Sequence, residues 1–521
     1  MVIPVASLAE LLIKQLPASL AWSPMACHGC RGVNVRASRM YRDQANATTD
    51  LMRSASAMPW ILVSGRSSYF ADTEGEAWTP IGQNDAISWP ELAGLFRRRD
   101  MGAVERHLEW LASQGVTCLR LMLEYAQVRH RYIERPAGSF VPAMVQLWDD
   151  LFTLCERIGL RILLTPVDTF WTWLHWRHHP WNSANGGPCD SPSRLLLCPR
   201  TRVVIKTRLE FAVRRWGGSG ALFAWDLWNE IHPAQAEDRA DCFNDFIHDL
   251  SQHVRCLELE LYGRSHLQTV SLFGPELALK PHLDLREPIF RHPDLDFATI
   301  HVYQTGSIDN PRDTVRPALA MGKIVRDCLG EIVDHRPFLD TEHGPIHSFK
   351  DKHETLSQPF DDEYFRHISW AHLASGGAGG GMRWPNRHPH VLTIGMRAAQ
   401  CAMGAFLPLI AWTTFRPRNL NDESAAAGFH VFACGDDDQA IAWIVRRGGR
   451  DQRGMIPENV DPRSTTLTLP VSREGEWHLH LFDTRAGEVL REAHVQSSGG
   501  ALVATIDGLG GDIAIAARRA G

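Results

Sequence analysis

The chain has 521 residues, 44% of them hydrophobic and 22% charged, which is an ordinary composition for a globular protein in water. Its formal net charge of -6 is spread without long blocks of one sign, so the sequence favours neither a nucleic-acid partner nor an anionic membrane. No apolar run approaches the roughly 20 residues that a membrane-spanning helix needs. At this length we expect more than one domain.

The cysteine pattern is typical of a reducing compartment. The 11 cysteines are odd in number and scattered, and several fall within predicted helices or strands, as Cys118, Cys155 and Cys328 do. We therefore predict free thiols and a cytoplasmic location. Cys27 and Cys30 form a single CxxC pair without a second pair at metal-site spacing, so they give little support for a metal site.

Residues 1–57 show no sustained periodicity, and we expect them to form an extension outside the main fold. Short apolar pieces at 60–63 and 69–70 then predict a hairpin. From there, apolar residues at helical spacing alternate with short apolar runs, a pattern typical of repeated strand–helix units. Helices in this pattern are expected to stop near Gly115, Gly159 and Gly217. Strands are predicted at 78–82, 116–123, 160–167, 222–230, 267–273, 297–302, 338–342 and 381–384.

Eight strands alternating with helices are the number found in a (β/α)8 TIM barrel, which we assign to residues 58–405. After about residue 406 the helical patterns fade, and Gly, Asp and Arg clusters separate short alternating runs. This pattern of short alternating runs predicts a small all-β sandwich at 406–521. Its expected strands lie at 429–432, 440–445, 465–469, 477–482 and 513–516.

Two glutamates stand at the ends of predicted strands. Residues 222–230 read Leu-Phe-Ala-Trp-Asp-Leu-Trp-Asn-Glu, an apolar strand that ends on Glu230, and Glu342 ends the strand 338–342. A barrel brings the carboxyl ends of its strands to one rim, so we expect the two carboxylates to meet. Cleavage of a glycosidic bond needs such a pair, one protonated to release the leaving group and one ionised at the anomeric carbon.

Trp228-Asn229-Glu230 followed by Thr341-Glu342-His343-Gly344 resembles clan A of the glycoside hydrolases, closest to family 5. The resemblance implies that Glu230 is the acid/base and Glu342 the nucleophile of a retaining enzyme. It also implies a β-sandwich appended to the barrel, as the tail suggests. The further residues that it places around the substrate are Arg120, Asn229, His301, Tyr303 and Trp384.

The sequence departs from the family pattern after the third predicted strand. Thr165-Pro166-Val167-Asp168 stands where many family members carry a histidine, and a long Trp-rich and His-rich insertion follows. In that insertion Trp171 is a candidate for stacking on a sugar, although packing of the insertion on itself is the better explanation of its aromatic residues. Glu124 and Asp168, also at strand ends, are weaker candidates for substrate contact.

We read the chain as a retaining β-glycosidase acting on an oligosaccharide or polysaccharide of the β-mannan or β-glucan type, without a metal or organic cofactor. Two alternatives stay open. One is a carbohydrate-binding barrel without turnover. The other is a metal-dependent barrel hydrolase built on His175, His178 and His179. The sequence does not indicate the sugar, the mode of cleavage or the oligomeric state.

Overall fold

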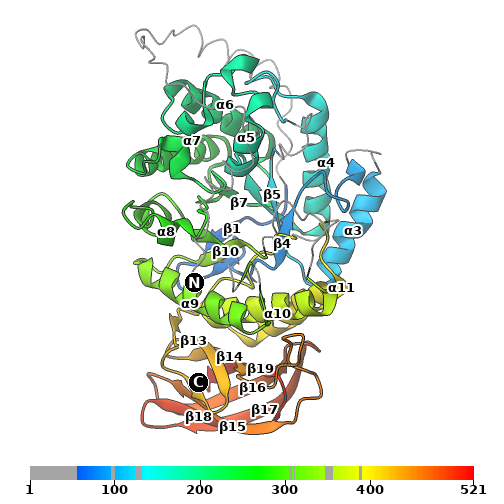
Figure 1. The fold of residues 1–521 in the computed structure, drawn as a ribbon, viewed down its shortest axis with the longest axis vertical. Coiled ribbons are helices and arrows are strands. Elements are labelled where there is room, and N and C mark those ends of the chain that lie inside the picture. Colours follow the sequence, from blue (N-terminus) through cyan, green and yellow to red (C-terminus); the bar gives the residue numbers. More distant parts are fainter. Residues whose placement is uncertain are drawn as a thin grey trace.

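The computed structural model describes residues 56–95, 100–124, 132–303, 308–309, 311–345, 356–385 and 390–520. Figure 1 shows parallel strands with helices around them, and antiparallel sheets beneath α10 (Gln358–Ala374) and α11 (Ile394–Phe406). The predicted extension 1–57 lies outside the described residues except for 56 and 57, and so do Cys27 and Cys30. Within the described ranges, no helix is both long enough and apolar enough to cross a lipid bilayer.

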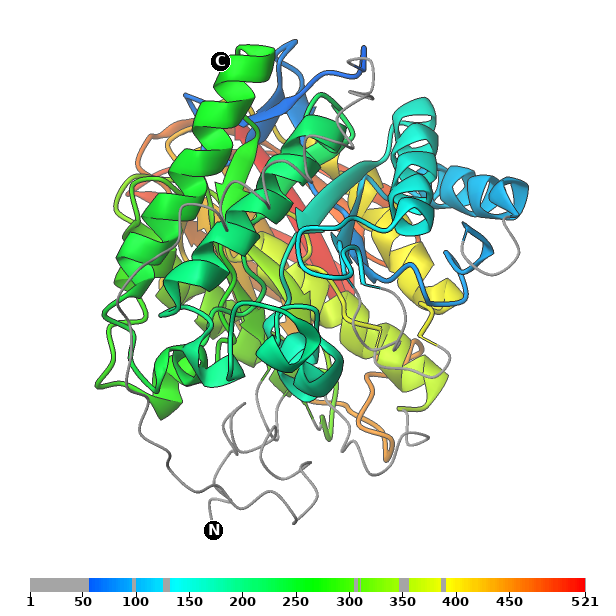
Figure 2. The same cartoon turned by 90° about the horizontal axis from the view of Figure 1, so that it is seen from above.

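Parallel strands form the centre of the larger part. Five of them make one sheet in the order β4-β5-β6-β7-β8, and β10 pairs with β9 in a second sheet. Helices surround these strands when the molecule is seen from above (Figure 2), which explains why every residue of the strands is buried. The strands are β4 (Gly82–Asp85), β5 (Cys118–Met122), β6 (Arg161–Thr165), β7 (Leu222–Asp226), β8 (Leu267–Thr269), β9 (Ala298–Val302) and β10 (Phe338–His343).

The helices form where apolar residues recur at helical spacing. Pro142 at the first turn starts α4 and Gly159 ends it, with φ at +90°, a conformation that glycine adopts without a steric penalty. The predicted helix ends near Gly115, Gly159 and Gly217 are confirmed. The α-helices besides α10 and α11 are α3 (Met101–Ser113), α4 (Pro142–Ile158), α5 (Thr169–Leu174), α6 (Pro199–Trp216), α7 (Phe243–Tyr262), α8 (Glu276–Leu279) and α9 (Arg316–Glu331). Shorter 3-10 or π turns are η2 (Trp176–His178), η3 (Ser183–Asn185), η4 (Pro192–Arg194), η5 (Pro233–Ala236), η6 (Glu287–Arg291) and η7 (Leu407–Leu409).

The predicted first and eighth strands are wrong in their positions. Ala77–Trp78 belongs to β3 of a small antiparallel sheet, and the first parallel strand starts only at Gly82. The hairpin predicted before it is confirmed as β1 (Ile61–Val63) paired with β2 (Phe70–Asp72). Pro80 separates β3 from β4, because proline has no N–H to donate to a strand ladder.

At 381–384, a single residue takes part in strand pairing. Arg383 forms one parallel bridge with Gln83 of β4 and another with His343 of β10. Gly379 and Gly381 hold φ at +75° and +74°, which is incompatible with regular extended backbone. A full eighth strand is therefore absent from this segment, although its one bridging residue lies between β10 and β4.

The C-terminal part is all-β, as predicted. A six-stranded antiparallel sheet has the order β11-β13-β14-β19-β16-β17, and a second has the order β12-β15-β18. Residues of both sheets share one apolar core, with Ile444 and Leu479 on the first sheet and Leu467 and Leu502 on the second. The strands are β11 (Arg418–Asn419), β12 (Ala425–Ala426), β13 (Phe429–Gly435), β14 (Gln439–Arg446), β15 (Arg463–Pro470), β16 (Gly475–Asp483), β17 (Glu488–Ser497), β18 (Ala501–Leu509) and β19 (Asp512–Arg519).

Helix α10 joins the two parts through a buried ion pair. Arg366 of α10 donates to Asp512 at the start of β19 over 2.7 Å, and both side chains are 5% exposed. Trp443 of β14 donates its indole N–H to the same carboxylate over 2.8 Å. Burial alone would raise the pKa of Asp512, but the Arg366 guanidinium outweighs it and lowers the pKa to about 2. The limits 58–405 and 406–521 stay predictions.

We expect Asp512→Asn to destabilise the protein by about 2 kcal/mol at pH 7, because the buried Arg366 cation then keeps only Glu363 of its two carboxylate partners. The stability that Asp512 contributes is present above its unfolded pKa of about 4 and is lost as the pH falls toward 2. Urea unfolding between pH 7 and pH 3 measures both effects. The exposed Asp507→Asn is the control, and equal stability of the two variants would contradict the prediction.

Candidate active site

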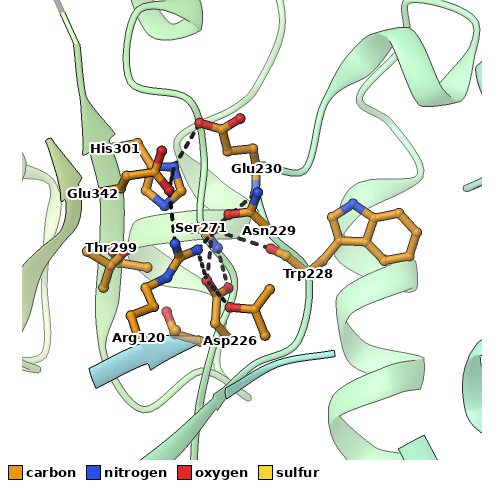
Figure 3. A network of polar contacts seen from close by, with 12 residues as sticks. Arg120, Asp226, Trp228, Asn229, Glu230, Ser271, Thr299, His301 and Glu342 are labelled. Carbon is orange, nitrogen blue, oxygen red and sulfur yellow. Dashed lines mark hydrogen bonds and ion pairs between the residues drawn. The ribbon is translucent and has the colours of Figure 1, made fainter. Parts of the chain in front are cut away.

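The ends of β7, β9 and β10 bring the two predicted glutamates together (Figure 3). Glu342 lies within β10, and Glu230 follows β7. One carboxylate oxygen of each lies within 4.8 Å of the other, and a ring nitrogen of His301 is within the same distance of both. The two residues are 5% and 8% exposed. The geometric expectation from the sequence is therefore met.

Glu342 receives two strong hydrogen bonds. Arg120 of β5 donates from Nη1 to Glu342 Oε2 over 2.9 Å, and the Tyr303 hydroxyl donates to Glu342 Oε1 over 2.7 Å. Burial raises the pKa of Glu342 to about 7, while the Arg120 charge and the Tyr303 hydrogen bond act in the opposite direction. These two donors stabilise the ionised form of this carboxyl group.

Glu230 lies in a different environment. The predicted strand 222–230 ends at Asp226, four residues earlier than expected, and Glu230 holds φ at +50°, which is unusual for a residue with a side chain. Its N–H donates to Ser271 Oγ over 3.0 Å, and its Oε1 lies 2.8 Å from His301 Nδ1. Burial, reinforced by the charge of Glu342, raises the pKa of Glu230 well above its usual range. Burial also lowers the pKa of His301, and Arg120 adds to this, so the imidazole is neutral.

Arg120 connects both glutamates to the strands beneath them. Its Nη1 also donates to Asn84 Oδ1 over 2.8 Å, and its Nη2 donates to Asp226 Oδ2 over 2.7 Å. The same Nη2 donates to Asn229 Oδ1 over 2.5 Å. Since the guanidinium is fixed in a plane, these contacts orient Asn229 and the backbone that carries Glu230.

Asn229 is held at both ends of its amide. Its Nδ2 donates to Asp168 Oδ1 over 2.6 Å, while its Oδ1 accepts from Arg120. Asp168 also caps α5 by accepting from the N–H groups of Phe170 and Trp171. Burial raises the pKa of Asp168 to about 6. Asp168 therefore lies in the site, where its contacts hold Asn229 and the start of α5.

The two predicted tryptophans lie beside the glutamate pair. Trp384 packs against the cluster of Phe273 and Tyr303, and Trp384 and Trp171 both pack against the cluster of Ala86, Trp89 and Met122. Trp384 meets Trp89 edge to face, with ring centroids 5.0 Å apart. Trp384 and Trp171 are only partly buried. With Trp89 they form a cluster that we call the aromatic wall.

Glu124 contacts the histidine-rich insertion and helps to hold it in place. Glu124 Oε2 lies 2.9 Å from Arg208 Nη1 and 3.3 Å from His179 Nε2, all three being buried. Trp181 donates its indole N–H to Glu134 over 2.7 Å. Within the insertion, the Trp181 N–H donates to His179 Nδ1 over 3.2 Å, and the ring of His179 stacks on Trp176, so packing of the insertion on itself is confirmed for His179 and Trp181. In the described part of the chain, no group of three ligand-type side chains includes His175, His178 or His179.

Sequence reasoning gave no role to Asn84, Trp89, Asp226 and Ser271, which the structure places at or beneath the site. The sequence did give an indication for Asp226, because an ionisable residue inside a buried strand needs a cation partner. Asn84 directly follows the predicted first strand, and its role could have been inferred from a correct strand boundary. No sequence pattern marked Trp89 or Ser271, since it is the tertiary fold that brings them to the site.

Glu230, His301 and Glu342 have spacing that a metal ion could use. However, the Arg120 guanidinium already lies 2.9 Å from Glu342, so a fixed positive charge faces any cation there. The arrangement fits proton transfer between the two carboxyl groups and a substrate better than it fits metal coordination.

No family model matches the sequence, and no curated protein matches it. Solved structures do share its fold. A glycoside hydrolase family 5 protein from Bacteroides vulgatus aligns over 89% of this chain and 94% of its own, with 10% identity and a TM-score of 0.54. A second protein from that organism, described as a candidate glycoside hydrolase, aligns over 90% of this chain and 84% of its own, with 12% identity and the same TM-score.

The chain therefore shares its fold with a solved glycoside hydrolase of family 5. At identities this low the similarity concerns the fold alone, so the roles of individual residues rest on the contacts described above.

We predict that Asp226→Asn destabilises the protein by about 3 kcal/mol, because the buried Arg120 cation loses its nearest carboxylate. Ser271→Ala removes no charge but only the hydrogen bonds of the Ser271 hydroxyl, which donates to Asp226 and accepts from the Glu230 N–H, and we expect a loss of about 1 kcal/mol. Urea unfolding of the two variants gives the comparison. A loss in Asp226→Asn no larger than that in Ser271→Ala would show that Arg120 does not depend on this carboxylate.

Proposed function

We propose that this protein is a retaining β-glycosidase in which Glu342 is the nucleophile and Glu230 the acid/base. One observation carries the proposal. Two buried carboxyl groups lie close together, and only Glu342 is hydrogen bonded to a cation and a phenol, while Glu230 contacts a neutral imidazole. The proton shared by such a pair is therefore favoured on Glu230.

The separation of the pair supports retention of configuration. Retaining enzymes hold their carboxyl groups about 5 to 5.5 Å apart, whereas inverting enzymes leave roughly 6.5 to 9.5 Å for a water molecule. The closest oxygens of Glu230 and Glu342 lie within 4.8 Å, which fits the shorter class.

In the proposed reaction, Glu342 attacks the anomeric carbon while Glu230 gives its proton to the leaving oxygen. The C–O bond to the leaving group breaks, and an ester between the sugar and Glu342 forms. Glu230, now ionised, takes a proton from water, and the resulting hydroxide displaces Glu342. Arg120 and Tyr303 stabilise the carboxylate of Glu342 each time it leaves the sugar.

The same proposal includes a closed (β/α)8 barrel. Phe273 bridges to His301 between the chain after β8 and β9, and Arg383 bridges to both β10 and β4. These single-residue pairings link the two parallel sheets at both edges, which supports closure around a common axis.

We further propose a β-linked oligosaccharide or polysaccharide of the β-mannan or β-glucan type as substrate. The wall formed by Trp384 and Trp171 supports this, because apolar sugar faces stack on indole rings. A cytoplasmic location and independence from cofactors remain predictions. The alternative, a carbohydrate-binding protein without turnover, predicts binding but no hydrolysis on a panel of aryl β-glycosides and β-glycans.

We predict that Glu342→Ala lowers kcat by at least about 10⁴-fold while substrate affinity is largely kept, because the variant loses the attacking group rather than the aromatic wall. Steady-state kinetics and calorimetric binding measure the two quantities. The exposed Glu458→Ala is the control. In the wild type, the first product anomer seen by NMR must keep the configuration of the substrate, and an inverted product would refute a nucleophilic Glu342.

The pH dependence offers a separate prediction. Glu342 must be ionised to attack, so activity falls on the acid side as Glu342 becomes protonated. The Tyr303 hydrogen bond lowers the pKa of Glu342, and Tyr303→Phe should therefore move the acid limb of the kcat/KM profile to higher pH. Tyr262→Phe, which removes a hydroxyl bonded to Val213, is the control. An acid limb that stays in place, or moves lower, would contradict this role.

A further inference from the structure

β16 and β17 are neighbouring strands of the C-terminal part (Figure 1), and histidines and glutamates lie opposite one another along this pair. Alternate residues of a strand share a face, so His478 and His480 project to one side of β16 while Trp477, Leu479 and Leu481 fill the core on the other. In the antiparallel register, His478 lies opposite His494 of β17, and His480 lies opposite Glu492.

These side chains converge. Glu492 Oε2 lies 3.0 Å from His478 Nε2, and Glu492 Oε1 lies 3.8 Å from His480 Nε2. One ligand atom from each of the three residues falls within 4.8 Å of the other two. The rings of His478 and His480 have centroids 4.3 Å apart.

We propose that His478, His480 and Glu492 form a binding site for one divalent transition-metal ion of the Zn²⁺ class, with water completing the coordination. This site is separate from the glutamate pair, and the inference does not depend on the proposed function.

The distances between the three ligand atoms suit a zinc site. Zinc binds imidazole nitrogen and carboxylate oxygen at about 2.0 to 2.2 Å, which places neighbouring ligand atoms of a tetrahedral site about 3.3 Å apart. Small rotations of three side chains on a surface strand pair reach that distance from the arrangement observed. Two imidazoles with one carboxylate also favour transition metals over Ca²⁺ or Mg²⁺, which prefer oxygen ligands.

The neighbouring groups fit a site of this kind. His494 stacks on His478 with centroids 4.7 Å apart, and its Nδ1 lies 3.1 Å from Glu476 Oε1, so this pair supports the ring of His478.

A second cluster elsewhere is a weaker candidate. Asp85, Glu91 and His107 also place ligand atoms within 4.8 Å of one another. The buried Arg397 guanidinium, however, lies 3.3 Å from Glu91 Oε2, so a fixed positive charge would repel a metal ion.

The proposed ion would fasten an edge strand. β17 lies at the end of the six-stranded sheet, and most of its residues are exposed. A metal that joins His478 and His480 of β16 to Glu492 of β17 would tie this edge to its neighbour and stabilise the folded sheet by linkage.

Calorimetric titration of the metal-free full chain with Zn²⁺, at neutral pH, tests the proposal. We expect the double variant His478→Asn, His480→Asn to lose one Zn²⁺ equivalent per chain, and Glu492→Gln to bind that equivalent at least about 10-fold more weakly. The exposed His248→Asn is the control and should bind as the wild type does. Co²⁺ bound to the wild type should show the visible spectrum of a tetrahedral site. The double variant should not show this spectrum.

Zinc stoichiometry that is the same in the wild type and the double variant would overturn the proposal, because another site would then hold the ion. Circular dichroism confirms that each variant is folded, and the conservative Glu492→Gln provides the test if the double variant is not. Since the readout is metal binding, failure here leaves the glycosidase proposal untouched, and failure of hydrolysis leaves the metal site untouched.

Discussion

The structure of the site depends on one buried cation. Arg120 is 1% exposed and directs its two Nη groups to Asn84, Asp226, Asn229 and Glu342. A guanidinium in this position would be costly without carboxylates beside it, and two of them stand at ion-pair distance. The same contacts that satisfy the charge fix the positions of both catalytic candidates, so stability and function rest on shared interactions.

The two glutamates differ because of their neighbours rather than their own chemistry. Both are buried, and burial alone raises the pKa of each. Arg120 and Tyr303 then favour charge on Glu342, whereas Glu230 meets only a ring that burial keeps neutral. Such an asymmetry divides one proton between two like groups, which is what acid and nucleophile roles at a single bond require.

The C-terminal sheets rest on the helical side of the larger part and not beside the glutamate pair. α10 presents Arg366 to Asp512, and Trp370 of the same helix packs near Phe482 of β16, with ring centroids 6.0 Å apart. A buried ion pair together with aromatic contacts fixes the relative orientation of the two parts. The face of β16 and β17 that carries His478, His480 and Glu492 extends from this junction toward the exposed edge of the sheet.

The sequence by itself determined the pairing of Glu230 with Glu342, the helix ends at glycines and most strands, because apolar periodicity and strand-end carboxylates are local signals. It missed β18 and also β17, most of whose residues are exposed at the edge of the sheet. It misplaced the first and eighth strands, where Pro80, Gly379 and Gly381 interrupt the backbone. Only the tertiary structure decided that Asp226 neutralises Arg120 and that Trp89 joins the aromatic wall. These contacts join residues far apart in the chain, and their energies depend on burial and distance, which a linear pattern does not contain.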